Sequence, residues 1–262
     1  MIKSAILKRA AIPYVCELQI QIMKSFRIVS IFIICFLAFN AQAQTADDVI
    51  AGYVKFIGGE KNWEKIKTIT TSGEYNYGGV AFPFTTLSKA PNQYKFIVPF
   101  NGKHYTQAFD GTNGWKIDAF KGETQPTLLS GKPAMALANE ADVELEDALI
   151  NYKAKGHQTT FEGKENIEGK ECFKIKFNRK NGEIETYYFD SKTYALILKN
   201  TIAKNAELEG ALLNIYYSNY KSVEGIKIPF KTICKSNDQT ILTITLERAE
   251  LNKPIADKEF QP

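Results

Sequence analysis

The feature that most constrains this chain is a run of alternating strands and turn signals between residues 157 and 251. Phe173, Ile175 and Phe177 alternate with Cys or Lys, and Asn181-Gly182 then supplies a hairpin turn. Further alternating segments bounded by Gly, Asn or Asp follow at 183–189, 195–203, 211–221, 226–235 and 240–250. This pattern is typical of an antiparallel meander whose apolar face needs a cover.

The first half of the chain, between residues 68 and 118, shows the same pattern. Asn101-Gly102 is a two-residue hairpin signal, and Pro83 places its strand near a sheet edge or a bulge. We interpret the two meanders as halves of one continuous, curved sheet.

Two segments are predicted to cover that sheet. Thr45 can cap a helix whose apolar stripe ends before Gly58-Gly59, and a further helical turn carries Trp63 inward. The alternation also stops between residues 119 and 156, where a short helix over Pro133–Ala141 and a second over 143–152 are expected. The fold is therefore predicted to be α+β and mainly β. It is a strongly curved antiparallel sheet, an incomplete barrel covered by an N-terminal helix and a helical lid.

The N-terminus predicts export. Met23 begins a short basic region, residues 28–39 are almost wholly apolar, and Ala41-Gln42-Ala43 matches a cleavage site. We expect a signal peptide over residues 1–43, with Met23 as an alternative start that would exclude residues 1–22. The apolar core is too short to favour a membrane anchor, and Cys35 follows a large Ile where lipidation needs a small residue. Residues 44–262 then form a single periplasmic domain.

The net charge of the chain after the signal peptide argues against nucleic acid as a partner. Residues 1–43 hold five bases and one acid, so the remaining chain has 28 Lys and Arg against 28 Asp and Glu. A neutral protein lacks the basic surface by which nucleic-acid binders reach phosphates.

Two cysteines, Cys172 and Cys234, remain after cleavage. In an oxidising compartment an even pair suggests a disulfide. The alternation places Cys172 on the face of Lys174, whereas Cys234 shares a face with Ile228, so the side chains would diverge if both strands belong to one sheet. A disulfide and two free thiols both stay open.

The sequence offers little for catalysis. It contains two histidines, His104 and His157, and none of the common metal, nucleophile or phosphate-loop motifs. Glu183 and Glu185 fall on one face of a strand, and we interpret them as a solvated edge. We expect neither a metal nor a cofactor and predict that the protein is not an enzyme. An envelope hydrolase ranks third, below a binding protein and below a structural module of the envelope.

The positive signal is apolar and aromatic. A curved sheet with a helical lid can enclose a site for an apolar ligand, although each such residue could equally be ordinary core. The predicted ligand-binding residues are Phe82, Phe84, Tyr94, Phe96, Tyr105, Trp115, Met135, Leu137, Ile175 and Phe177.

Several fragments carry a family resemblance when taken in order. They are Phe56-Ile57-Gly58-Gly59, Ala108-Phe109-Asp110-Gly111, Gly114-Trp115, 152–157, 169–175, Tyr187-Tyr188-Phe189-Asp190, 218–221, 225–229 and 250–255. With this order and spacing the chain resembles the outer-membrane lipoprotein-sorting (LolA-like) proteins, in particular small exported members from Bacteroidetes-type bacteria. The resemblance implies a half-barrel plugged by helices whose apolar cavity holds the acyl chains of lipoproteins or lipids.

One departure concerns mechanism. The family's carrier holds its lid through an Arg on an early strand, whereas this chain has only Arg179 and Arg248 after the signal peptide, both late. We therefore predict a periplasmic binding or carrier protein for an acyl-chain ligand, lipid or lipoprotein, with an envelope protein as a further partner. The alternative is a structural or interaction module of the envelope whose concave face is filled by its own helices.

Overall fold

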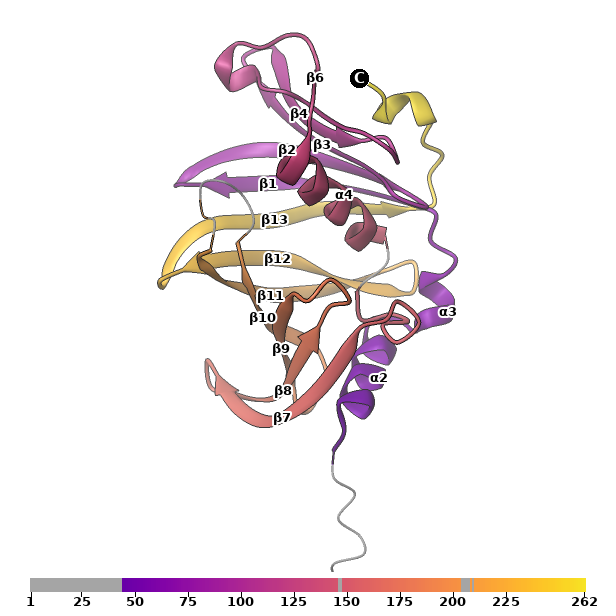
Figure 1. Cartoon of the computed structure of the whole chain (residues 1–262), viewed down its shortest axis with the longest axis vertical. Helices are drawn as coiled ribbons and strands as arrows, with labels where there is room; N and C mark the ends of the chain where they lie inside the picture. The colour runs from indigo at the N-terminus through magenta and orange to yellow at the C-terminus, as the bar shows by residue number, and fades with distance from the viewer. Residues whose placement is uncertain (1–43, 146–147, 204–207, 209) are drawn as a thin grey trace, which may run out of the picture. The chain divides into compact units, whose positions relative to one another are not determined.

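The computed structural model describes residues 44–145, 148–203, 208 and 210–262 (Figure 1). The predicted signal peptide lies outside the described residues. Thr45–Pro262 form one compact unit, which consists mainly of strands.

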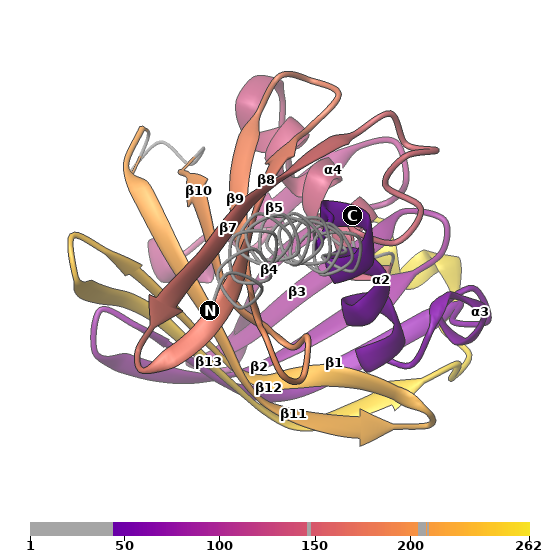
Figure 2. The ribbon, with the colours of Figure 1, turned by 90° about the horizontal axis from the view of Figure 1, so that it is seen from below.

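The described strands of that unit form a single antiparallel sheet with 13 members. They are β1 (Thr68–Tyr77), β2 (Val80–Lys89), β3 (Gln93–Phe100), β4 (Lys103–Phe109), β5 (Gly114–Ile117), β6 (Thr127–Leu128), β7 (Gln158–Ile167), β8 (Lys170–Asn178), β9 (Ile184–Asp190), β10 (Leu196–Ile202), β11 (Leu212–Val223), β12 (Ile226–Ser236) and β13 (Gln239–Leu251). Their order is β6-β5-β4-β3-β2-β1-β13-β12-β11-β10-β9-β8-β7. Pairing of β1 with β13 joins the two predicted meanders, and β6 and β7 remain as edges, so the described strands do not close into a barrel. The prediction of one curved sheet is confirmed (Figure 2).

The turns form where the sequence supplies residues that tolerate positive φ. Asn101 and Gly102 have φ of 48° and 73°, as the predicted hairpin requires. Gly73 sits at a bulge between β1 and β13, where a Cβ would lie 2.0 Å from the carbonyl oxygen of Thr245. Pro83 lies on an interior strand but outside the part of β2 that pairs with β3, so no hydrogen bond to β3 is lost there.

The N-terminal helix α2 (Ala46–Phe56) begins as predicted. The Thr45 side chain accepts a hydrogen bond from the Asp48 N–H at 3.1 Å, and the Asp48 carboxylate accepts one from the Thr45 N–H. A short helix, α3 (Glu60–Trp63), follows, and its Trp63 indole donates to the carbonyl of Ile57 at 3.1 Å.

The insertion between the two meanders departs from the prediction. It holds a 3-10 turn, η1 (Ala119–Lys121), then β6 and one long helix, α4 (Gly131–Leu145). The predicted second helix over 143–152 is wrong, because residues 148–156 form turns. Ala148, Leu149 and Ile150 are all buried, and three consecutive side chains cannot share one face of a helix.

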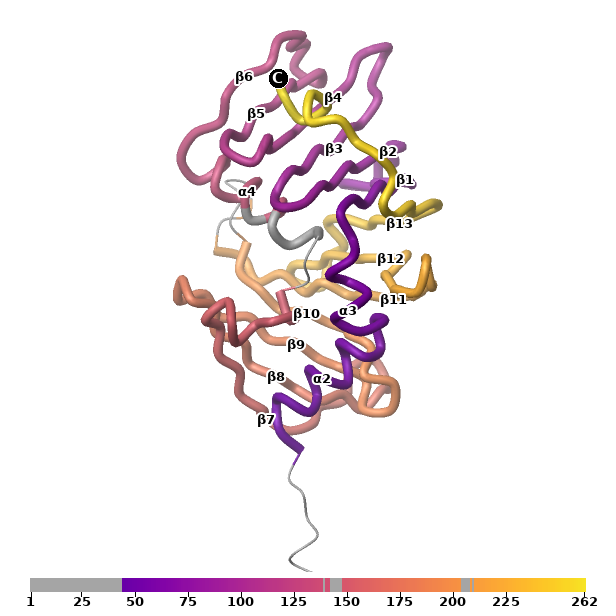
Figure 3. Tube along the Cα trace, turned by 90° about the vertical axis from the view of Figure 1, so that its right-hand side faces the viewer, coloured from indigo at the N-terminus to yellow at the C-terminus, as the bar shows by residue number. Residues whose placement is uncertain are grey.

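Both helices cover the same face of the sheet, which curves around them (Figure 2). Leu137 and Ala141 of α4 pack against Tyr94 and Phe109 over β2 to β5. At the other end of the sheet α2 belongs to the large core with residues of β8, β9 and β12, as the side view in Figure 3 shows for β8 and β9. We call the covered face concave and the other face convex.

The convex face has a smaller cover of its own. The C-terminal turn η2 (Asp257–Phe260) lies beside β3, and its Phe260 is fully buried. The Trp115 indole donates a hydrogen bond of 2.7 Å to the carbonyl of Phe260. The end of the chain is thereby fastened to the outside of the first meander.

Candidate functional site

One row of directly opposed residues crosses the concave face. Its successive members are Ile175, Tyr187, Lys199, Ile215, Cys234, Leu242 and Tyr77. Opposed residues on neighbouring strands share a face. Ile175 and Tyr187 are buried in the core that α2 covers, the next four members are half-buried, and Tyr77 is exposed. Within the part of the chain that the structure describes, the cover of the concave face is therefore incomplete over the central strands.

The apolar side chains in this uncovered region form a continuous surface, which we name the central concave patch. Direct pairing relates Tyr75 to Ile244, and Cys234 to both Leu242 and Ile215. The patch consists of Tyr75, Ile215, Cys234, Leu242, Ile244 and Leu246, all half-buried. Such a surface within a curved sheet is the kind of place where proteins take apolar ligands.

An aromatic cluster continues the patch toward β4. The ring of Tyr75 lies 5.3 Å from that of Phe96, and Phe120 of η1 contacts Phe100, Tyr105 and Phe82 at 4.5 to 5.5 Å between centroids. Burial, helped by the charge of Asp118, raises the pKa of Tyr105 to about 12. Phe120, which is 46% exposed, was not among the predicted site residues because it lies outside any alternating segment.

Six predicted ligand-binding residues lie on this side of the concave face. Phe84 and Tyr94 are buried, and Phe82, Phe96 and Tyr105 are half-buried. Leu137 is the α4 residue that packs over Tyr94. The structure thus brings together residues of β2, β3, β4 and the lid, next to the central concave patch.

The other four predicted residues lie elsewhere. Trp115 is opposed to Ala108 and lies on the convex face under the C-terminal turn, because β5 pairs with β4 in that register. Met135 points outward from α4 and is 66% exposed. Ile175 and Phe177 are on the concave face but fully buried in the core with α2. We leave these four out of the candidate site.

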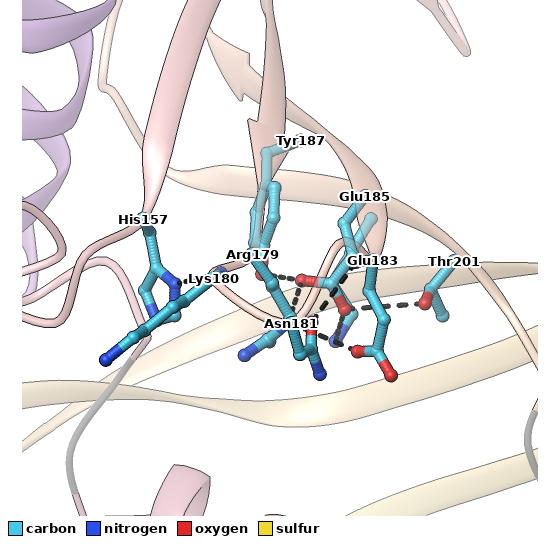
Figure 4. A network of polar contacts seen from close by, with 9 residues as sticks. His157, Arg179, Lys180, Asn181, Glu183, Glu185, Tyr187 and Thr201 are labelled. Carbon is cyan, nitrogen blue, oxygen red and sulfur yellow. Dashed lines mark hydrogen bonds and ion pairs between the residues drawn. The ribbon is translucent and has the colours of Figure 1, made fainter.

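A buried polar network borders the patch, and it corrects the interpretation of Glu185 as a solvated edge (Figure 4). Glu185 is 4% exposed and lies on an interior strand. Its Oε2 accepts hydrogen bonds of 2.9 Å from Arg179 Nε and from the Tyr187 hydroxyl. Its Oε1 lies 3.7 Å from Lys199 Nζ and accepts a 3.4 Å bond from Thr201. Glu185 shares its strand face with Tyr187 and Phe189, a signal of burial that was present in the sequence.

The electrostatics of this network favour charged side chains. Burial alone would raise the pKa of Glu185, but the charges of Lys199 and Arg179 outweigh it and hold that pKa below its ordinary value. Burial raises the pKa of the Cys234 thiol, and the charge of Lys199 opposes this rise. Lys199 therefore acts on both the network and the central concave patch.

The two cysteines are free thiols. Cys172 is fully buried on the convex face with Tyr188 and Leu198, whereas Cys234 belongs to the central concave patch. The divergence of the two side chains is confirmed, and of the two open alternatives the free thiols are the observed one.

Within the part of the chain that the structure describes, no group of three His, Cys, Asp or Glu is placed to hold a metal ion. His104 is exposed, and His157 accepts a hydrogen bond at Nδ1 from the backbone N–H of Lys180. None of the described helices is long and apolar enough to cross a membrane.

Comparison by sequence finds no matching protein-family model and no matching curated protein. Solved structures do match. A DUF1329 family protein from Desulfovibrio piger is 16% identical, with a TM-score of 0.55 over 81% of this chain and 97% of that one. A LolA superfamily protein from Nitrosomonas europaea is 12% identical, with a TM-score of 0.54 over 84% and 99%.

The fold is LolA-like. A third match, a putative outer membrane lipoprotein-sorting protein domain from Vibrio parahaemolyticus, is 10% identical, with a TM-score of 0.52 over 81% and 97% of the two chains. At these identities the likeness concerns the fold, which confirms the predicted LolA-like sheet with its helical cover. Function has to be argued from the site.

Proposed function

We propose that this protein is a periplasmic carrier that binds the acyl chain of a lipid or lipoprotein on the central concave patch, without catalysis. The observation that carries the proposal is the half-burial of Tyr75, Ile215, Leu242, Ile244 and Leu246 on the covered side of the sheet. Among the described residues, α2 and α4 cover the two ends of this face and leave its centre half-buried, and such an apolar surface binds an apolar ligand more favourably than water. The likeness to a lipoprotein-sorting domain in fold supports this ligand class.

The free energy gained by burying an acyl chain on the patch is large enough for a carrier. Burying one methylene contributes about 0.8 kcal/mol, so an acyl chain buried over ten methylenes would gain about 8 kcal/mol before the costs of association. Export through a signal peptide over residues 1–43 and membership of the small exported Bacteroidetes-type group are parts of the same proposal. The proposal also includes a single domain over residues 44–262 and a partner protein in the envelope.

A displacement assay tests the proposal. The neutral fluorescent probe N-phenyl-1-naphthylamine should bind to the purified protein and be displaced by dodecanoate. Substitution Ile244→Gln places a polar group in the patch and should weaken both ligands about tenfold, since it removes apolar contact with the chain. Ile233→Gln is the matched control, because Ile233 is a half-buried Ile on the convex face of the neighbouring strand.

The competing function is an envelope module whose concave face is filled by its own helices. The burial of Ile175 and Phe177 beneath α2 favours it at that end of the sheet. Under this alternative neither probe nor dodecanoate binds, and Ile244→Gln and Ile233→Gln behave alike. Native mass spectrometry of the purified protein gives an independent answer, because a carrier should co-purify with lipid.

A further inference from the structure

Six of the eight exposed large hydrophobic side chains among the described residues lie at one end of the sheet. Because neighbouring strands run in opposite directions, the ends of β1 and β10 lie at the same end of the sheet as the starts of β2, β9 and β11, and η1 follows β5 there. Figure 1 shows the β1–β2 and β12–β13 hairpins of this end on the left, away from α2 and α3. We name these six side chains, which are 42–55% exposed, the apolar rim: Tyr77, Val80, Phe120, Ile184, Ile202 and Leu212.

The apolar rim includes residues from both faces of the sheet. Tyr77 is directly opposed to Val80 on one neighbouring strand and to Leu242 of the central concave patch on the other, so these residues lie on the concave face. Ile202 is directly opposed to Leu212 on the convex face. A partner that covers a single face of the sheet would contact one of these groups, whereas a partner that meets the strand ends contacts both.

The apolar rim is wide. From β5 to β9 it spans ten neighbouring strands, which at about 4.8 Å between strands is an arc of about 40 Å. The turn between Tyr77 and Val80 is Gly78-Gly79, which has no side chains to project beyond them. A row of apolar side chains at exposed strand ends matches a lipid bilayer, because the apolar interior of a bilayer accepts such side chains without a complementary shape.

Exposed lysines accompany the apolar rim. Lys103, Lys121 and Lys180 are all exposed at this end of the sheet. Lys103 is directly opposed to Phe100, whose ring lies 4.5 Å from that of Phe120. Aromatic side chains flanked by lysines are typical of surfaces that enter the head-group region of a membrane. Each lysine near an anionic surface strengthens the attraction.

Acidic residues oppose this positive charge only in part. Asp238, in the turn between β12 and β13, is exposed, whereas Glu123 and Glu183 are half-buried. Asp118 is buried and lies 3.4 Å from Lys121 Nζ, yet 71% of the Lys121 side chain remains exposed. The exposed charge of the described residues at this end is therefore positive, which favours a bilayer that contains anionic lipids.

The apolar rim is continuous with the candidate site. The ring of Tyr77 stacks on that of Tyr75 in the central concave patch, with 6.4 Å between the centroids. Phe120 contacts Tyr105 of the neighbouring aromatic cluster at 5.5 Å. An acyl chain that leaves a bilayer at the rim therefore reaches the patch along apolar side chains, without being exposed to water.

We propose that the apolar rim docks on an anionic lipid bilayer, and that the acyl chain passes between the bilayer and the central concave patch across Tyr77 and Phe120. The inference extends the proposed function and rests on it for the ligand, because the patch is the site that the chain enters. The docking itself depends on the rim and its lysines.

Co-sedimentation with lipid vesicles measures the docking. The chain from Gln44 to Pro262 is used, since Thr45–Pro262 form one compact unit and the apolar residues 28–39 would bind lipid by themselves. Vesicles of phosphatidylethanolamine and phosphatidylglycerol in equal parts should bind the wild type at least about tenfold more tightly than vesicles of phosphatidylcholine. High salt should weaken this preference, because it screens exposed charges.

Variants of the apolar side chains test the rim itself. Val80→Gln and Ile202→Gln, on the two faces of the sheet, should each weaken binding to the anionic vesicles about tenfold, because a polar group replaces an apolar one that the bilayer buries. Met135→Gln is the matched control and should bind as the wild type does. Met135 is 66% exposed but follows Ala134 of α4, which lies beside Gly114 at the opposite end of β5 from η1.

Variants of the lysines test the charge. Lys103→Gln should weaken binding to the anionic vesicles about fivefold and leave binding to phosphatidylcholine unchanged. Lys258→Gln is the matched control and should bind both kinds of vesicle as the wild type does. Lys258 is an exposed lysine of η2, where the adjacent Asp257 pairs with Lys89 at the opposite end of β2 from the rim.

The results distinguish the docking from the carrier function. If the wild type does not bind the anionic vesicles, or if Val80→Gln and Ile202→Gln bind them equally well, the inference is wrong, while displacement of N-phenyl-1-naphthylamine by dodecanoate still supports the carrier. Binding only to vesicles that contain envelope proteins assigns the rim to a protein partner and overturns the lipid assignment. Docking without any binding of the probe overturns the carrier function alone. Because Ile202 lies on the convex face, Ile202→Gln should bind dodecanoate in solution as the wild type does, which shows that lost docking is not lost folding.

Discussion

One glycine of α2, Gly52, lies in close contact with a tyrosine ring, and its replacement makes a quantitative prediction. A Cβ at Gly52 would lie 2.3 Å from Cδ1 and 2.6 Å from Cγ of Tyr194, in the connection between β9 and β10. Ordinary contacts begin near 3.4 Å. Because Cγ, at the base of the ring, also lies closer than 3.0 Å, the whole ring must move, and a rotation about the Cβ–Cγ bond does not suffice.

The free energies can be worked from that geometry. Overpacking of this kind costs about 1–3 kcal/mol, while Gly to Ala inside a helix gains about 1 kcal/mol. Gly52→Ala should therefore lower the free energy of unfolding by about 1 kcal/mol in the wild type. In a Tyr194→Ala background the clash is absent, and the same substitution should raise that free energy by about 1 kcal/mol.

The assay is urea unfolding of all four proteins, followed by tryptophan fluorescence. A coupling energy of about 2 kcal/mol between the two positions is expected. Ala51→Gly on the exposed face of α2 is the control, and should cost about 1 kcal/mol in both backgrounds. A stabilising effect of Gly52→Ala that is the same with and without Tyr194 would refute the proposed close contact.

Three further predictions concern Glu185 in the buried polar network, the chain length of the ligand, and Trp115, which lies outside the candidate site. Glu185→Gln should lower the free energy of unfolding by about 3 kcal/mol at neutral pH, because it removes the buried negative charge that faces Arg179 and Lys199. Since the pKa of Glu185 is lower in the folded state than its ordinary value of 4.5, this difference is fully present above that value. It should shrink as the pH falls through the folded pKa, which urea titrations at neutral pH and about pH 3 would show. In a series from decanoate to tetradecanoate, affinity measured by probe displacement should rise about fourfold per methylene, and a flat series would contradict acyl-chain burial. Trp115→Phe should cost about 1 kcal/mol through the lost bond to Phe260, yet leave dodecanoate affinity unchanged; a weakened affinity would return Trp115 to the site.

The site was only partly predictable from the sequence. Phe82, Phe84, Phe96 and Tyr105, four of the predicted residues, do lie on one face of the sheet, and alternation helps to find such residues because the period of two in a strand is local. It could not show that Trp115 belongs to the opposite face, since that depends on the register of a four-residue strand. Residues of the central strands were not predicted because their alternation resembles that of any half-buried sheet.

Glu185 shows a different kind of failure. Its chemistry favours solvent, and a pair of carboxylates on an alternating strand is usually exposed. In the folded protein the strand face of Glu185 is covered, and Arg179 and Lys199 lie beside the carboxylate. Glu185 can therefore be buried, because the opposite charges and the hydrogen bonds offset the cost of burial. Ile184, next to it, is 54% exposed, so the polar residue is inside and the apolar one outside.

The sequence by itself determined the strands, the hairpin turns and the start of α2, because propensity, period and capping act between residues close in the chain. The tertiary structure decided how those parts combine. Pairing of β1 with β13 joins residues from opposite ends of the domain, and α4 packs on one face of the first meander and covers it. The half-buried centre of the concave face and the buried polar network at its border follow from these long-range contacts, which no local pattern encodes.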